Sequence, residues 1–248
     1  MWTVSIWLVS GTDTGIGKTV VTAATAVAAA KVGQSVAVIK PAESGIVPDF
    51  GMESDMAVVA RLARPESTRV LASYPDALSP LAAAQEAGAV PLAIGDVIEA
   101  VRVAEHRYDV VLVEGAGGLL VPIGEGRWTL ADLAVALRAP VVVVSRAGLG
   151  TLNHTALTLE ALAHRGINGL VVLGSWPRTP ELVHWRNLAD VPGELAGVLP
   201  EGAGALDPHE FRAQAPGWLS PALYGRADPA ELRREGVAGP PPRWPEPA

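Results

Sequence analysis

The sequence predicts a single α/β domain in which helices cover both faces of a parallel β-sheet. Short β-branched apolar runs recur along the chain, and Ala- and Leu-rich segments of helical length separate most of them. Apolar residues fill these runs without alternation, which is typical of strands that are buried on both faces. The strand–helix alternation then favours right-handed crossovers, and therefore a parallel sheet between two helical layers.

The predicted elements follow from these patterns in chain order. Strands are expected at residues 3–10, 35–40, 109–114, 140–145, 169–174 and 195–199. Helices are expected at Thr19–Val32, Ile94–His106, Leu130–Arg138 and Leu152–Arg165. The domain is predicted to span residues 1–225, with a disordered Pro-rich tail at residues 226–248. Five prolines lie in the terminal stretch GVAGPPPRWPEPA, which has almost no residues that could pack.

Composition and charge narrow the possible classes of function. The chain has 248 residues, a net charge of -7 and a pI near 5.2, whereas nucleic-acid binding relies on a basic surface. The absence of cysteine excludes disulfides, thiolate metal sites and a cysteine nucleophile. The apolar runs are too short to cross a bilayer, and the apolar start has no basic n-region. We therefore expect a cytoplasmic protein whose main partner is neither nucleic acid nor membrane.

The segment LVSGTDTGIGKTVV, Leu8 to Val21, has the character of a phosphate-binding loop. It follows a predicted strand and opens a predicted helix, where backbone N–H groups and the helix dipole can hold an anion. The loop is one residue longer than the common spacing, because Thr12 stands where that spacing requires glycine and the nearest glycine is Gly11. A plain Gly-rich turn is the alternative, but the order of strand, loop, Lys-Thr and helix favours a phosphate-loop NTPase-like fold.

Polar residues follow other predicted strands, at the edge of the sheet where ligands bind in open α/β folds. Lys40 ends the second strand and Ser44 lies in the loop after it; a lone lysine there is otherwise a solvated loop charge. Asp55 stands at an expected helix start, where it would serve either as an N-terminal cap or as a metal ligand.

Two later motifs carry further candidates. In VLVEGAGGLLVP, Glu114 ends a buried strand, and the glycines after it let the backbone approach a ligand closely. Acidic residues at such strand ends help to hold Mg²⁺ in phosphate-loop enzymes. In AGLGTLNHTALTLEAL, Thr151 or Asn153 starts a helix; Asn153 is otherwise a simple cap residue, and His154 is interpreted as an exposed helix residue.

Together, the motifs GTDTGIGKT, KPAESG, ESD, VEGAGGLLVP and LGTLNHTALTLEAL resemble those of the dethiobiotin synthetase family, in order from about Val4 to Leu199. The longer phosphate loop is part of that family's pattern. The resemblance implies an ATP-dependent ligase of biotin biosynthesis. In its reaction 7,8-diaminononanoate takes up carbon dioxide as a carbamate, ATP phosphorylates the carbamate, and the second amine closes the ring to give dethiobiotin.

The resemblance also implies roles for individual residues. Lys40 and Lys18 would be catalytic, and Thr19, Asp55 and Glu114 would hold Mg²⁺. The nucleotide is expected to contact Gly15, Ile16, Gly17, Lys18, Thr19, Val20, Asp55, Glu114, Gly115, Ala116, Gly117, Gly174, Ser175, Leu199, Pro200 and Glu201. The diamine or its carbamate is expected to contact Thr12, Lys40, Ser44, Gly117, Gly150, Thr151, Leu152 and Asn153. The helix start at 150–153 would come from the partner subunit of a homodimer.

The sequence departs from the family where the base of the nucleotide is read. Well-known members end the strand corresponding to 169–174 with an Asn-Asp pair, whereas this chain has LGSWP. Gly174 has no side chain and Ser175 has one short hydroxyl, so we expect several nucleoside triphosphates to be accepted.

The rival interpretation is a nucleotide-switch ATPase of the partitioning or electron-transfer type. Those proteins carry an additional lysine early in the loop, where this chain has Asp13. Related amide synthases add a glutaminase domain with a cysteine nucleophile, which a chain of this length without cysteine does not contain.

Overall fold

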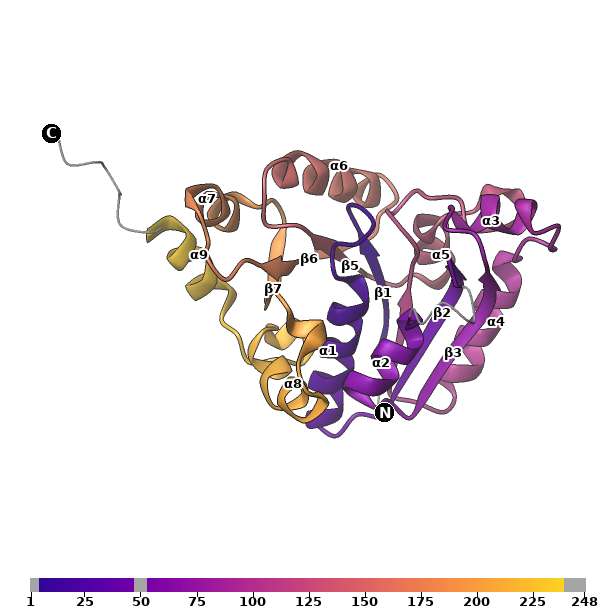
Figure 1. Cartoon of the computed structure of the whole chain (residues 1–248), viewed down its shortest axis with the longest axis horizontal. Coiled ribbons are helices and arrows are strands. Elements are labelled where there is room, and N and C mark those ends of the chain that lie inside the picture. Colours follow the sequence, from indigo (N-terminus) through magenta and orange to yellow (C-terminus); the bar gives the residue numbers. More distant parts are fainter. Residues whose placement is uncertain (1–4, 47–52, 239–248) are drawn as a thin grey trace, which may run out of the picture.

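The computed structural model describes residues 5–46 and 53–238, and its centre is a parallel sheet in the order β3-β2-β4-β1-β5-β6-β7. The strands are β1 (Ser5–Gly11), β2 (Val36–Ser44), β3 (Ser67–Tyr74), β4 (Val110–Glu114), β5 (Val141–Ser145), β6 (Gly169–Trp176) and β7 (Glu194–Pro200). Figure 1 shows this sheet running through the molecule between its helices. The predicted α/β fold with a parallel sheet is confirmed.

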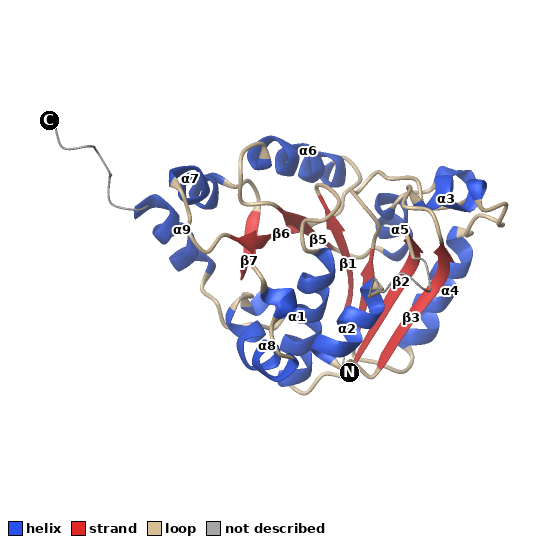
Figure 2. Cartoon of the chain, viewed as in Figure 1, coloured by secondary structure: helices blue, strands red, loops and turns tan. Residues whose placement is uncertain are grey.

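The sheet lies between two layers of helices, and each layer has its own apolar core. The α-helices are α1 (Lys18–Lys31), α2 (Asp55–Ala63), α3 (Pro80–Glu86), α4 (Ile94–Glu105), α5 (Leu130–Leu137), α6 (Thr151–Ala163), α7 (Leu182–Asp190), α8 (Pro208–Gln214) and α9 (Pro229–Ala238). Helices α1, α2 and α8 pack on one face, whereas α3, α4 and α5 pack on the other (Figure 2). No helix in these described ranges is long and apolar enough to span a bilayer.

Strand β3 is absent from the elements predicted from the sequence because it lies at the edge of the sheet. It pairs only with β2, and most of its residues are exposed or half-buried. An edge strand does not need the continuous apolar run by which the central strands were recognised.

Strand β2 continues past the predicted end at Lys40 to Ser44, through Pro41. Its pairing with β4 stops at Ile39, so beyond that point β2 has a neighbour on one side only, where proline is tolerated.

The C-terminal part also differs from the prediction. Residues 229–238 form α9, which packs against α7, so the expected disorder from residue 226 is wrong over this range. Leu232 packs against the apolar cluster of β6, β7 and α7. Arg233 donates hydrogen bonds of 2.8 to 3.0 Å to the carbonyls of Ala189, Val191 and Gly193. Because residues 228–235 are mostly charged, the sequence gives little sign of these few contacts. The proline-rich residues 239–248, and residues 3 and 4 of the first predicted strand, lie outside the described residues.

Candidate active site

A cavity of about 570 Å³ opens at the carboxyl edge of the sheet, between the phosphate loop, the end of β2, the start of α2 and the loop after β4. Its walls are formed by Thr14, Gly15, Gly17, Lys18, Thr19, Val20, Lys40, Ala42, Glu43, Ser44, Asp55, Val58, Arg61, Ala116, Gly117 and Gly204. Parallel strands end at one edge of the sheet, so side chains that are far apart in the sequence meet there.

The phosphate loop requires glycine at two positions. Gly15 and Gly17 have φ values of 69° and 95°, in the left-handed region that other residues rarely adopt. Gly17 also packs on the end of β6, because a Cβ at this position would stand 2.8 Å from the Gly174 carbonyl oxygen. No side chain caps the start of α1. Its first backbone N–H groups are therefore available to an anionic ligand.

Lys18 lies in this loop with its ammonium largely buried. Its Nζ donates a 2.8 Å hydrogen bond to the backbone carbonyl of Asp13. Burial lowers the pKa of Lys18 below its ordinary value, and the neighbouring Lys40 ammonium lowers it further. A buried ammonium at a cavity wall favours an anionic ligand.

Lys40, Asp55, Glu114 and Thr19 form a compact polar cluster at the base of the cavity. The Lys40 Nζ lies 2.6 Å from Asp55 Oδ2 and 2.7 Å from Glu114 Oε1, and it donates a 3.0 Å hydrogen bond to the Gly115 carbonyl. The Thr19 hydroxyl oxygen lies 2.9 Å from both Asp55 Oδ1 and Glu114 Oε1. The sequence predicted each of these four side chains separately, and the structure brings them together.

The charges in this cluster stabilise one another. Burial alone would lower the pKa of Lys40, but Glu114 and Asp55 together outweigh burial and hold that pKa above its ordinary value. Burial would raise the pKa of Asp55, but Lys40 outweighs it, with hydrogen bonds from Lys40 and Thr19 adding to the effect, so this pKa is lowered. Both groups are therefore charged at neutral pH.

The same cluster has the donor set for a hard divalent cation. The Thr19 hydroxyl can donate to only one of its two carboxylate neighbours at a time, and Glu114 Oε2 is buried with no hydrogen-bond partner in the described part of the chain. Within residues 5–46 and 53–238, no three Asp, Glu, His or Cys side chains gather into a complete metal site. Such a partial set of oxygen ligands suits Mg²⁺, which usually keeps water and phosphate oxygens in its shell.

Two charged residues of the cavity wall were not among the predicted site residues. Glu43 is buried, accepts a 3.1 Å hydrogen bond from the Met56 N–H, and has a pKa raised by burial. It lies within the motif KPAESG, on the part of β2 where the sequence predicts a loop. Arg61 lines the cavity from α2, three residues after Val58, but its spacing of six residues from Asp55 gives no sequence signal for this position.

Of the predicted substrate contacts Ser44 and Thr12, only Ser44 lines the cavity. The Ser44 hydroxyl donates a 2.7 Å hydrogen bond to the Leu78 carbonyl. Thr12 does not line the cavity. Its N–H donates a 3.0 Å hydrogen bond to the Val144 carbonyl, and its hydroxyl is buried without a partner in the described residues. Thr14 lies on the cavity wall instead.

The two segments expected to contact the base, residues 174–175 and 199–201, lie side by side at the ends of β6 and β7. They do not line the cavity. The Glu201 N–H donates a 2.7 Å hydrogen bond to the Trp176 carbonyl, and the Glu201 carboxylate accepts one of 3.1 Å from the Arg178 N–H. Ser175 is exposed, whereas Gly174 is buried against the phosphate loop.

The start of α6, at residues 150–153, does not line the cavity of its own chain. Gly150 has a φ of 87° and begins the helix without a side-chain cap. Thr151 is buried, and its hydroxyl lies 3.5 Å from that of Thr155. Leu152 and Asn153 are exposed on the first turn.

Comparison with known proteins is consistent with this geometry. A family model described as an AAA domain matches residues 7–201. The ATP-dependent dethiobiotin synthetase BioD of Streptomyces avermitilis is 50% identical over 229 residues, covering 90% of this chain and 95% of that protein. That of Saccharopolyspora erythraea is 52% identical over 227 residues, covering 90% and 98%.

Among solved structures, a ParA family ATPase from Chlorobium tepidum has a TM-score of 0.54 at 14% identity, with 90% of this chain and 97% of that chain covered. This likeness extends to the fold alone. The relatives of about 50% identity share nearly the whole chain. The chain belongs to the family of ATP-dependent dethiobiotin synthetases.

Proposed function

We propose that this protein uses ATP and Mg²⁺ to join carbon dioxide to 7,8-diaminononanoate and close the ureido ring of dethiobiotin. The observation that carries the proposal is that Lys18, Thr19, Lys40 and Asp55 line one cavity, with Glu114 buried behind Thr19 and Lys40. Family membership supports the same activity.

The chemistry requires an anion to be activated. One amine of the substrate adds to carbon dioxide and forms a carbamate, which is a poor electrophile. The γ-phosphoryl group of ATP is transferred to a carbamate oxygen, giving ADP and a carbamic–phosphoric anhydride. The second amine then attacks the carbonyl carbon, closes the ring and releases phosphate. Phosphoryl transfer depends mainly on positioning and charge neutralisation, which buried lysines can supply.

We assign each part of this task to residues of the chain. Lys18 and the N–H groups at the start of α1 would bind the β- and γ-phosphates. Lys40 would neutralise the carbamate and the transferring phosphoryl group, and it is fixed for this role by its two carboxylate neighbours. Thr19, Asp55 and Glu114 would hold Mg²⁺, which supplies positive charge to the phosphate oxygens.

The proposal includes a homodimer that completes the substrate site. The start of α6 lies away from the cavity of its own chain, so it would bind the substrate carboxylate of the partner's site through its free N–H groups. Exposed leucines around this helix start support an interface: Leu149 is 82% exposed and Leu157 56%. Sedimentation showing only a fully active monomer at micromolar concentration would contradict this part of the proposal. Because ATP is the co-substrate, we place the reaction in the cytoplasm.

The test is turnover of the purified protein with ATP and Mg²⁺, with and without diaminononanoate and bicarbonate. We expect ADP release to depend on both added substrates and dethiobiotin to accumulate in equal amount, as measured by mass spectrometry. ATP hydrolysis at the same rate without the diamine, with no dethiobiotin formed, would contradict a synthetase and favour a nucleotide switch. Lys31→Ala serves as a control variant, because Lys31 is an exposed lysine at the far end of α1.

A further inference from the structure

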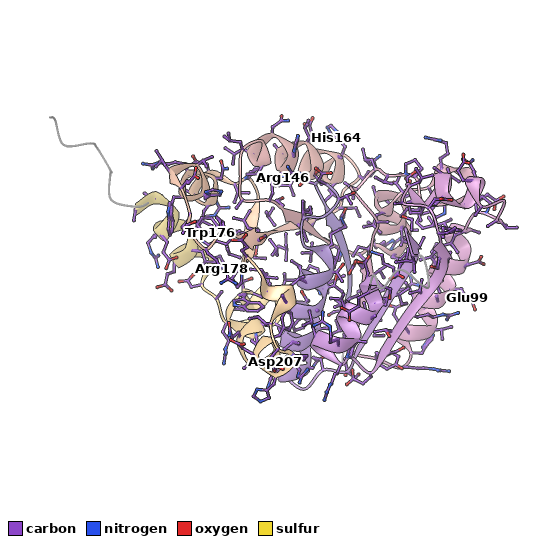
Figure 3. All side chains as sticks on the ribbon, in the orientation of Figure 1. Glu99, Arg146, His164, Trp176, Arg178 and Asp207 are labelled. Atoms are coloured by element: carbon purple, nitrogen blue, oxygen red, sulfur yellow. The ribbon has the colours of Figure 1, made fainter. Side chains whose placement is uncertain are left out.

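Arg146 lies directly after β5, beside the phosphate loop and near α6 (Figure 3). Its Nη2 donates a hydrogen bond to the Asp13 carboxylate, and the two side chains form an ion pair. Both side chains are partly exposed, at 42% and 51%, and neither is among the residues that line the cavity. The pair joins two loops that are more than a hundred residues apart in the sequence.

Asp13 holds the phosphate loop through three different groups. Its Oδ1 accepts a 2.8 Å hydrogen bond from the Thr14 N–H, its Oδ2 accepts from Arg146, and its backbone carbonyl accepts from Lys18 Nζ at 2.8 Å. The conformation of the loop, and the position of its lysine, therefore depend on this residue.

A carboxylate in a phosphate-binding loop has an electrostatic cost. The Thr14 N–H lowers the pKa of Asp13, and Arg146 lowers it further, so the carboxylate is charged at neutral pH. A triphosphate bound at Gly15 to Thr19 would lie close to this negative charge and be repelled by it. The Arg146 guanidinium stands where it cancels that charge.

The loop that carries Arg146 is itself fixed. Asn187 of α7 is buried, and its Nδ2 donates hydrogen bonds of 2.8 Å to the Ala147 carbonyl and 2.9 Å to the Gly148 carbonyl. The Thr12 N–H also joins the start of the phosphate loop to Val144 of β5. Because the loop that carries Arg146 is held on both sides of this residue, the Arg146 guanidinium is kept in place beside Asp13.

We propose that Arg146 is a positioning residue that acts through Asp13: it neutralises the carboxylate of the phosphate loop and so favours nucleotide binding, without being a ligand of the triphosphate. This inference rests on the proposed function in that the loop binds a triphosphate.

A double-mutant cycle tests the proposal by equilibrium binding of ATP and by the KM for ATP. Arg146→Ala leaves Asp13 uncompensated, so we expect ATP affinity to fall about tenfold with a much smaller change in kcat. Asp13→Asn keeps the oxygen that accepts from Thr14 but removes the charge, so affinity should rise by up to about threefold. The double variant should bind within about threefold of the wild type, because neither charge remains. Arg146→Lys should recover most of the loss.

Ionic strength separates this role from a merely structural one. The defect of Arg146→Ala should shrink at about 0.5 M salt, where repulsion between exposed charges is screened. Arg102→Ala, which removes an arginine from an exposed ion pair with Glu105 on α4, should change nothing. A double variant that binds as weakly as Arg146→Ala would overturn the proposal and make Arg146 a direct ligand of the nucleotide, and unchanged affinity in Arg146→Ala would also overturn it. Because ATP binding is measured without the diamine, these outcomes stay distinct from a failure of synthetase activity.

Discussion

Replacing Lys40 by methionine removes the only cation that the described structure places between Asp55 and Glu114. The Lys40 and Glu114 side chains are 3% and 0% exposed, whereas Asp55 is 43% exposed. Breaking a buried ion pair costs about 3–5 kcal/mol, and the exposure of Asp55 places this case near the lower limit, at about 3 kcal/mol. For a chain of this size the melting temperature should fall by about 6–12 °C. Turnover should fall by roughly a hundredfold or more, because preorganised charge is lost from the site.

Thermal unfolding and dethiobiotin formation are measured on the same preparations, together with Lys40→Met/Glu114→Gln. The double variant has a neutral pair of similar size, so it should regain most of the lost melting temperature while remaining inactive. If Lys40→Met melts within about 1 °C of the wild type, the charge coupling inferred from the distances is wrong. If Lys40→Met keeps nearly full turnover at saturating substrate, Lys40 is not catalytic.

Four further predictions follow from other parts of the structure. Lys18→Ala should lower kcat/KM by roughly a hundredfold and weaken ATP binding measured by calorimetry, whereas Lys31→Ala should do neither. Ratios of kcat/KM among ATP, GTP, CTP and UTP should stay below roughly a hundredfold, because the end of β6 offers few side-chain groups to read the base; a larger preference for ATP would refute loose base reading. Truncation after Asp228 removes α9 and should lower the melting temperature by about 5 °C or more, and an unchanged value would mean that its packing on α7 adds no stability. Glu43→Gln should raise the melting temperature at pH 7, because the raised pKa of Glu43 means that the fold favours its neutral form. In the wild type, the stability contributed by neutral Glu43 is present at low pH and is lost as pH rises through the pKa of the folded state. The difference in melting temperature between Glu43→Gln and the wild type should therefore vanish at a pH below the ordinary pKa of glutamate. A difference that persists at low pH would mean that the charge of Glu43 is not its cause.

The sequence predicted the centre of the fold and the centre of the site for one physical reason. Strands β1, β2 and β4 are buried, so their apolar runs are continuous, and for β1 and β4 the carboxyl ends of the runs lie within one residue of the carboxyl ends of the strands. Glu114 is the last residue of β4, and Lys40 lies in β2 just after the pairing with β4 stops. Because β2 pairs with β4 and β4 with β1, both side chains lie close to Thr19, which follows β1.

Features at the periphery were less predictable. Strand β3 needs apolar residues on only part of its surface, and α9 is held by a few contacts within a charged segment. Glu43 was not predicted because the second strand was expected to end at Lys40, whereas β2 continues to Ser44 after its pairing with β4 stops. The pairing of Asp13 with Arg146 depends on how two distant loops approach each other, which no local pattern records.

The close approach of Gly174 to the phosphate loop limits how base selectivity could be introduced into this protein. A Cβ at Gly174 would stand 2.1 Å from the Ile16 carbonyl oxygen and 2.6 Å from a methyl carbon of Val144. An asparagine placed there to read adenine would displace the loop that binds the phosphates, so one substitution would exchange affinity for selectivity. A side chain added at this end of β6 to contact a base would therefore be accommodated at the exposed Ser175, whereas position 174 can change only if the loop is reshaped first.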